Sequence, residues 1–230
     1  DGFVSRGLGD VYKRQLNHLN NLYTTWEEAN DPEPLDGVII TGAPVEHLAF
    51  EEVKYWNEFV NITNEARNSC ASTLGLCWAG FALAYLAGVN KTVFDKKLFG
   101  VFPLKSLAPG HPLMGTQDDE FICPQSRFAG LPDLEMEEAQ KEGKLNLLAY
   151  GKDVGYTIFE TKDQKQLMHL GHPEYTVHRI ISEINRDKEK GDVPPPENFD
   201  INSSNTSWRS HRNLLFQQWL WFCYQQVSLS

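Results

Sequence analysis

The sequence lacks the features typical of membrane, secreted, metal-binding and disulfide-rich proteins. No apolar run approaches the roughly 20 residues that a membrane-spanning helix needs, and no signal peptide is visible. Its four cysteines, at positions 70, 77, 123 and 223, have neither the spacing of metal ligands nor the density of a disulfide scaffold. We therefore predict no metal site, no membrane partner and a reducing, cytoplasmic compartment.

Positive charge is also scarce. Lys and Arg number 21 against 31 Asp and Glu, which gives the 230 residues a formal net charge of −10 at pH 7. This balance argues against a nucleic-acid partner, and an anionic substrate would need a local basic pocket. The length is enough for one α/β domain with a sizeable core or for two small domains.

The first residues differ from the rest of the chain. Residues 1–15 have no clear amphipathic period, and we predict that they are a non-native leader ahead of a single domain over residues 16–230. The domain begins with alternating elements, which predict an α/β fold with helices on both faces of a mostly parallel sheet. The expected elements are strand 36–41, helix 51–67, strand 72–76, helix 79–87, strands 121–124 and 145–149, a hairpin of 155–161 and 165–170, and helices 176–190 and 213–227.

Cys77 ends the apolar strand 72–76, and small residues follow it. A strand that turns sharply into a helix presents a side chain at the helix N-terminus, where the dipole and free N–H groups favour a thiolate and an oxyanion. A lone cysteine in such a place is more often a buried core residue. Cys77 is therefore a candidate nucleophile only if another residue can act as its general base.

The segment Gly171–Tyr175 offers that base. His172 and Glu174 are two residues apart, so in extended backbone both side chains face the same way. A carboxylate there fixes the imidazole tautomer and supports the imidazolium that forms on proton transfer. Together with Cys77, these residues predict a catalytic triad. Because Thr41–Pro44 also follows a strand, we expect it in the same crevice.

Other candidates are weaker when taken alone. Glu46 follows the Gly-Ala-Pro turn, and taken alone such a residue is more often an ordinary solvated carboxylate. Lys97, Arg127 and Arg186 read equally well as surface charges, the usual position of such residues.

Seven motifs follow one another along the chain: Thr41-Gly-Ala-Pro-Val-Glu46, Phe50-Glu-Glu-Val-Lys-Tyr-Trp56, Cys77-Trp78, Lys97-Leu-Phe-Gly-Val101, Pro124-Gln-Ser-Arg127, Gly171-His-Pro-Glu-Tyr175 and Ser207-Trp-Arg-Ser-His211. In this order they resemble the homoserine O-acyltransferases, a coenzyme-A-dependent family. The resemblance runs from about residue 16 to residue 225 and implies a three-layer, flavodoxin-like fold of the class I glutamine amidotransferase type. Family members carry a further strand and helix upstream, so we expect an N-terminally truncated domain.

The resemblance implies a ping-pong reaction. Cys77 would take the acyl group from acyl-coenzyme A, and His172, oriented by Glu174, would act as general base on an amino-acid hydroxyl. The backbone N–H groups of Val45 and Trp78 would form the oxyanion hole.

The resemblance also implies the substrates. Lys97, Ser126, Arg127 and Arg186 fall on positions that the family uses around its substrates, where an arginine suits an α-carboxylate. Relatives with glycine in place of Glu46 accept succinyl-coenzyme A, whereas a glutamate repels the distal carboxylate of that donor. We therefore predict acetyl-coenzyme A as co-substrate and no permanently bound cofactor.

Two departures from the family concern the acceptor. Gln125 replaces the histidine of the usual Pro-His-Ser-Arg, and Val101–Leu104 replaces the usual Val-Tyr/Phe-Glu-His. Some similar proteins acetylate serine for cysteine synthesis, and one methylene contributes only about 1–3 kcal/mol of discrimination. We predict a homoserine O-acetyltransferase of methionine synthesis. The alternatives are a serine O-acetyltransferase, a glutamine amidotransferase domain and an inactive truncated fragment. A homodimer through the aromatic C-terminal helix is a further expectation.

Overall fold

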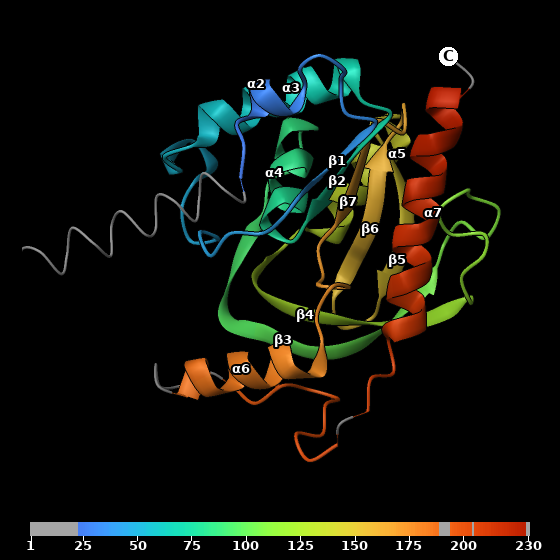
Figure 1. Cartoon of the computed structure of the whole chain (residues 1–230). Helices are drawn as coiled ribbons and strands as arrows, with labels where there is room; N and C mark the ends of the chain where they lie inside the picture. Colours follow the sequence, from blue (N-terminus) through green and yellow to red (C-terminus); the bar gives the residue numbers. More distant parts are fainter. Residues whose placement is uncertain (1–22, 189–193, 204, 229–230) are drawn as a thin grey trace, which may run out of the picture. The chain divides into compact units, whose positions relative to one another are not determined.

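The computed structural model describes residues 23–188, 194–203 and 205–228. The chain divides into a short unit up to Leu35 and a larger unit from Asp36. The predicted leader lies outside the described residues. The described part of the short unit holds helix α2 (Trp26–Ala29), which begins with a capping box of Thr25 and Glu28. The larger unit carries the sheet and its covering helices (Figure 1).

The described strands of the larger unit form one mixed, curled sheet in the order β1-β2-β7-β6-β5-β3-β4 (Figure 1). Strands β1, β2 and β7 run parallel, whereas the other neighbouring pairs are antiparallel. The prediction of a mostly parallel sheet is therefore wrong. Strands β5, β6 and β7 are joined by short turns, which pair strands antiparallel without a crossover helix. The strands are β1 (Gly37–Ile40), β2 (Ser72–Leu76), β3 (Thr92–Ser106), β4 (Glu120–Gly130), β5 (Leu145–Gly151), β6 (Gly155–Thr161) and β7 (Gln166–His169).

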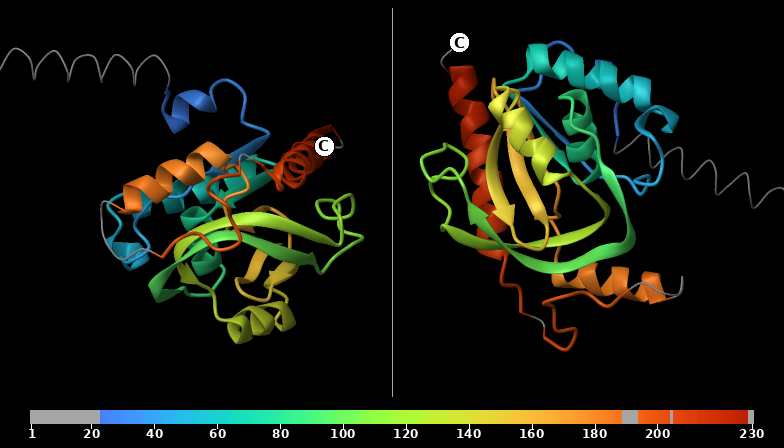
Figure 2. Two further views of the ribbon diagram at one scale, coloured as in Figure 1. Left: turned by 90° about the horizontal axis from the view of Figure 1, so that it is seen from below. Right: turned by 180° about the vertical axis from the view of Figure 1, so that it is seen from behind.

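Helices cover both faces of the sheet, as predicted. Helices α3, α4 and α5 share one hydrophobic cluster with β5, β6 and β7, and α7 shares another with the opposite faces of the strands (Figure 2). Helix α6 packs on β3 through a third cluster. The helices are the 3₁₀ turn η1 (Phe50–Glu52), α3 (Trp56–Ser69), α4 (Trp78–Leu86), α5 (Asp133–Lys141), α6 (Val177–Lys188) and α7 (Arg209–Ser228).

The junction of β2 and α4 lies in the most buried part of this arrangement. All five residues of β2 are buried, and α4 is apolar almost all round because it is buried from its first residue. A Cβ added to Gly80 would stand 3.1 Å from the Gly75 carbonyl oxygen and 3.3 Å from that of His169. Glycine therefore lets α4 lie directly on β2 and β7, which fixes where the chain turns at Cys77.

The sequence did not predict every element. Strand β3 and helix α5 were not expected, and β4 is longer than the predicted strand 121–124. Strand β3 contains Asp95, Lys96 and Lys97 where its pairing with β4 shifts register between Val93 and Leu98. This irregular stretch interrupts the alternation by which a strand is recognised.

Candidate active site

Cys77 stands at the turn between β2 and α4 in a strained backbone conformation. Its φ is 51° and its ψ is −116°, in a region that residues with a side chain rarely adopt. Two hydrogen bonds hold it, from the Cys77 N–H to the His169 carbonyl oxygen at 2.8 Å and from the Phe81 N–H to the Cys77 carbonyl oxygen at 3.1 Å. The same sharp turn in hydrolases exposes a nucleophile above a helix N-terminus.

His172 follows β7 and is fixed on three sides. The backbone N–H of His172 donates to the Pro124 carbonyl oxygen at 2.8 Å. The His172 ring stacks on that of Tyr175 with 4.2 Å between centroids. Its Nδ1 lies 2.7 Å from Glu174 Oε1. A carboxylate on Nδ1 leaves Nε2 to exchange a proton with another group.

The Cys77 thiol and the His172 imidazole line the same cavity and interact electrostatically. Burial opposes a charge on His172, but the interaction with Cys77 and the hydrogen bond to Glu174 outweigh it and raise the pKa of His172 to about 10. At neutral pH the imidazole in this arrangement is therefore protonated.

The triad lines a cavity of about 790 Å³. The turn after β1 forms one wall, where a Cβ added to Gly42 would stand 3.0 Å from Cys77 Cβ and 3.4 Å from the Trp78 nitrogen. Glycine is thus required for the close approach of this turn to the nucleophile. The lining residues are Thr41, Gly42, Ala43, Pro44, Glu46, His47, Cys77, Lys97, Ser126, Phe128, His172, Glu174, Tyr175, Thr176, Arg179, Glu183, Arg186 and Asp187.

A charged cluster from β3, β4 and α6 forms the opposite wall. Lys97 Nζ lies 2.6 Å from Glu183 Oε1 and 2.5 Å from Asp187 Oδ2, and Arg186 contacts both carboxylates at 3.0 and 3.4 Å. Ser126 Oγ donates to Glu183 Oε1. Burial raises the pKa of Glu183, but the bonds from Lys97 and Ser126 prevail and lower it to about 2. Opposite charges side by side suit a zwitterion such as an amino acid.

The structure brings most of the predicted site residues to this cavity, but not all. The Val45 N–H donates to the Ala43 carbonyl oxygen at 2.9 Å, so it is engaged within its own turn. Arg127 is 1% exposed, and its guanidinium donates to Gln125 Oε1 and to the carbonyl oxygens of Ala129 and Val154. Trp78 buries its side chain in the core, while its nitrogen lies beside Cys77 at the start of α4.

The two departures from the family motifs also lie away from the cavity. Gln125 is fully buried behind the His172 segment, and Phe102 and Leu104 belong to the core beneath α7. Sequence reasoning missed Glu183 and Asp187. They lie four and eight residues after Arg179, which places all three on one face of α6, and this spacing was visible in the sequence.

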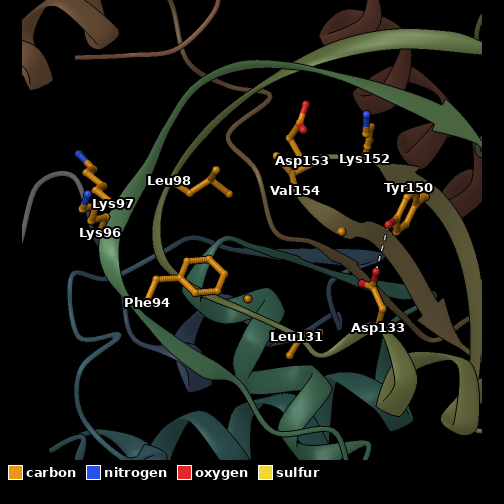
Figure 3. A pocket seen from close by; sticks show the side chains of 12 residues that line it. Phe94, Lys96, Lys97, Leu98, Leu131, Asp133, Tyr150, Lys152, Asp153 and Val154 are labelled. Carbon is orange, nitrogen blue, oxygen red and sulfur yellow. Dashed lines mark hydrogen bonds between the residues drawn. The ribbon is translucent and has the colours of Figure 1, made fainter. Parts of the chain in front are cut away.

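A second cavity of about 410 Å³ shares only Lys97 with the first (Figure 3). Its floor is apolar, with Phe94, Leu98 and Val154, and its rim carries both Lys152 and Asp153. None of the triad residues lines it. No helix in the described residues is both long and apolar enough to cross a bilayer, and the same residues contain no cluster of three metal-binding side chains.

The chain matches a known protein family. Residues 10–229 match the family model described as "HTS: Homoserine O-succinyltransferase". The chain belongs to the homoserine O-acyltransferase family. It is therefore an O-acyltransferase of a family that uses an acyl-CoA co-substrate, and the family resemblance and the enzyme class predicted from the motifs are confirmed.

Relatives in the homoserine O-acyltransferase family are named for two different acyl donors, acetyl and succinyl. The chain is 38% identical to "Homoserine O-acetyltransferase" of Bacillus subtilis (strain 168), over 91% of this chain and 71% of the relative. It is 36% identical to "Homoserine O-succinyltransferase" of Psychromonas ingrahamii (strain DSM 17664 / CCUG 51855 / 37), over 92% of this chain and 70% of the relative. Similarity to relatives thus does not decide the acyl donor.

Solved structures are similar in fold. The chain resembles the "glutamine amidotransferase (tm1158) from thermotoga maritima" with a TM-score of 0.64 and 13% identity, over 88% of this chain and 81% of that one. At this identity the likeness shows the α/β glutamine amidotransferase-like fold alone.

We predict that Gly42→Ala lowers kcat of acyl transfer by about 100-fold, the order expected when one oxyanion donor is lost. The added methyl group would crowd Cys77 and cover the Trp78 nitrogen. Steady-state kinetics with a thermal melt checks this. Gly110→Ala is the matched control, because a Cβ at Gly110 meets nothing within 4 Å. Equal activity of the two variants would contradict the prediction.

A second prediction concerns the His172 proton. NMR titration of labelled histidine should find His172 protonated at neutral pH and losing its proton near pH 10. Because the pKa in the folded state is raised above 6.5, this pair stabilises the fold fully below pH 6.5 and its contribution is lost as pH rises through about 10. In Cys77→Ala the pKa of His172 should fall, since the interaction with the thiol is gone. An unchanged titration in that variant would count against the pairing.

Proposed function

We propose that this chain transfers an acetyl group from acetyl-CoA to the hydroxyl of L-homoserine, through an acyl-Cys77 intermediate. The observation that carries the proposal is Cys77 at a strained turn, in one cavity with a histidine that a carboxylate orients and with a wall of paired opposite charges. The product belongs to methionine biosynthesis. We also propose the cytoplasm as its compartment, which the four unpaired cysteines support.

In the first half-reaction the Cys77 thiolate attacks the thioester carbonyl of the donor. The oxyanion that forms is stabilised by the Trp78 N–H and the N-terminus of α4. The tetrahedral intermediate then collapses, the bond to the coenzyme A sulfur breaks, and the His172 imidazolium donates its proton to that sulfur. Free coenzyme A leaves, and Cys77 carries the acetyl group as a neutral thioester.

Acylation changes the proton affinity of His172. The interaction with Cys77 is the largest of the contributions that raise the pKa of His172, and the thioester removes the charge of the thiol. Neutral His172 then takes the proton of the homoserine hydroxyl, whose oxygen attacks the thioester carbonyl. Release of O-acetylhomoserine returns the electron pair to Cys77 as a thiolate and leaves His172 protonated, as at the start.

The charged wall fits the amino-acid end of the acceptor. We propose that Arg186 binds the α-carboxylate, because its side chain is 48% exposed while those of Lys97 and Glu183 are nearly buried. Glu183 and Asp187 would receive the α-ammonium group, with Lys97 and Ser126 holding the two carboxylates in place. Arg127 has no part in this contact.

Homoserine is the proposed acceptor because the relatives reported above are named for homoserine rather than serine. A glutamine amidotransferase activity has less support, since likeness to amidotransferases extends to the fold alone. One assay separates the alternatives: acetyl-CoA with homoserine, acetyl-CoA with serine, and glutamine alone. Preference for serine, ammonia release from glutamine, or no turnover with any of them would each reject the proposal.

Cys77→Ala should abolish acetyl transfer, because no other described residue of the cavity wall is a thiol. After brief exposure to acetyl-CoA without acceptor, the wild type should gain the mass of one acetyl group, and the variant should not. Intact-protein mass spectrometry measures this directly. Persistent turnover in the variant would overturn the covalent mechanism.

We propose that Glu46 selects acetyl over succinyl donors. It lines the cavity and is 8% exposed, so a succinyl carboxylate beside it would lose solvent and meet a like charge.

Glu46→Gly should raise kcat/KM for succinyl-CoA by roughly tenfold or more, because like-charge contact costs on the order of several kcal/mol. The value for acetyl-CoA should change little. Glu46→Gln is the matched control, since it removes the charge but keeps the volume and thereby separates repulsion from crowding. An unchanged donor ratio in both variants would exclude this role.

A further inference from the structure

Three cationic side chains of Lys and Arg line the active-site cavity: Lys97, Arg179 and Arg186. Lys97 and Arg186 are both in ion pairs with Glu183 and Asp187. Arg179 forms no ion pair with any residue that the structure describes. It is thus the cation of this wall whose charge is available to a ligand.

Contacts with Tyr175 hold Arg179 in place. Its guanidinium carbon lies 5.4 Å from the centre of the Tyr175 ring, within the range of a cation–π contact. Its backbone N–H donates to Thr176 Oγ1 at 3.2 Å, in the first turn of α6. Tyr175 itself stacks on His172. Arg179 therefore stands next to the catalytic pair with its remaining donors exposed.

The position of Arg179 does not suit the acceptor. Arg179 and Arg186 are seven residues apart on α6, which is about 10 Å along a helix axis. Arg186 lies with the charged cluster where the zwitterion would bind, whereas Arg179 lies at the His172 end. An α-carboxylate bound by Arg186 is therefore too far from Arg179 to contact both, and we assign the anion at Arg179 to the other substrate.

The negative charge of the cavity wall also favours a cation that is free to bind the phosphates of the donor. The cavity wall holds four carboxylates, Glu46, Glu174, Glu183 and Asp187, and the whole chain has a net charge of −10. A donor whose nucleotide carries several phosphates is repelled by this field unless a cation meets it at the entrance. Arginine is suited to the task, because its planar fork binds phosphate through two hydrogen bonds.

We propose that Arg179 binds a phosphate group of the acyl donor's coenzyme A nucleotide as the acyl group reaches Cys77. The inference rests on the proposed function, because it takes an acyl-CoA as the donor. The second cavity is the competing location, with Lys96 and Lys152 among its lining (Figure 3). It is less suited, since it contains none of the triad residues.

The test compares wild type and Arg179→Gln on three donors: acetyl-CoA, acetyl-3′-dephospho-CoA and S-acetyl-pantetheine, which has no phosphate. We expect KM for acetyl-CoA to rise about tenfold in Arg179→Gln, equivalent to about 1.4 kcal/mol, with kcat nearly unchanged. The kinetics with S-acetyl-pantetheine should be the same in both proteins. Arg179→Lys should recover part of the loss, because it restores the charge without the fork.

The dephospho donor identifies the phosphate. If the effect of Arg179→Gln disappears with it, Arg179 binds the 3′-phosphate, and if the effect persists, Arg179 binds the pyrophosphate. Either result supports the proposal. Arg209→Gln removes an exposed arginine outside the cavity and is the matched control.

Three results would overturn the proposal. Equal losses with acetyl-CoA and S-acetyl-pantetheine would mean that Arg179 acts only through Tyr175 and His172. No loss with either donor would mean that it contacts neither. A rise in KM for acetyl-CoA in Lys96→Gln or Lys152→Gln, but not in Arg179→Gln, would move the phosphate to the second cavity. In each case wild-type turnover shows that the proposed function itself stands, whereas its failure is absence of wild-type turnover with all three donors.

Discussion

The parallel pairing of β1, β2 and β7 is the constraint on which the site depends. Ile40 of β1 is level with Gly75 of β2, and Leu76 of β2 is level with His169 of β7. Three chain segments far apart in the sequence therefore end together at one edge of the sheet, and Gly42, Cys77 and His172 follow two, one and three residues after the strand ends. A shift of one residue in either pairing would turn every side chain of the shifted strand to the other face and separate the thiol from the imidazole.

The antiparallel half of the sheet supports the charged wall of the cavity, which lies opposite the triad. Strands β3 and β4 extend beyond the other strands and support α6, whose buried face packs on β3 (Figure 1). Lys97 and Glu183 are almost fully buried, and buried charges are tolerated when each has a partner. Their mutual bonds therefore serve two purposes. They join α6 to the sheet, and they hold alternating charges at the cavity in the order that a zwitterion requires.

How much the sequence could predict differs between the two halves. The ends of short apolar strands are local signals, so the amino-acid pattern alone is enough to assign Cys77, His172 and the turn at Thr41–Pro44 to one crevice. The direction of side chains on β4 could not be predicted, because only its first part was recognised as a strand. Adjacent residues of a strand face opposite sides, and Ser126 faces the cavity, so Arg127 faces the core. A longer predicted strand would have excluded Arg127 from the substrate contacts.

The burial of Arg127 assigns it another part in this architecture. Burial lowers its pKa to about 10, so the guanidinium stays charged at neutral pH although its hydrogen-bond acceptors are all neutral. One acceptor is Gln125 Oε1, and Gln125 Nε2 would stand 2.4 Å from a Cβ added to Gly171. Arg127 thus fixes Gln125, and Gln125 packs against the residue that precedes His172. Gln125, in place of the family's histidine, therefore lies among the residues that support the His172 segment and outside the lining of the cavity.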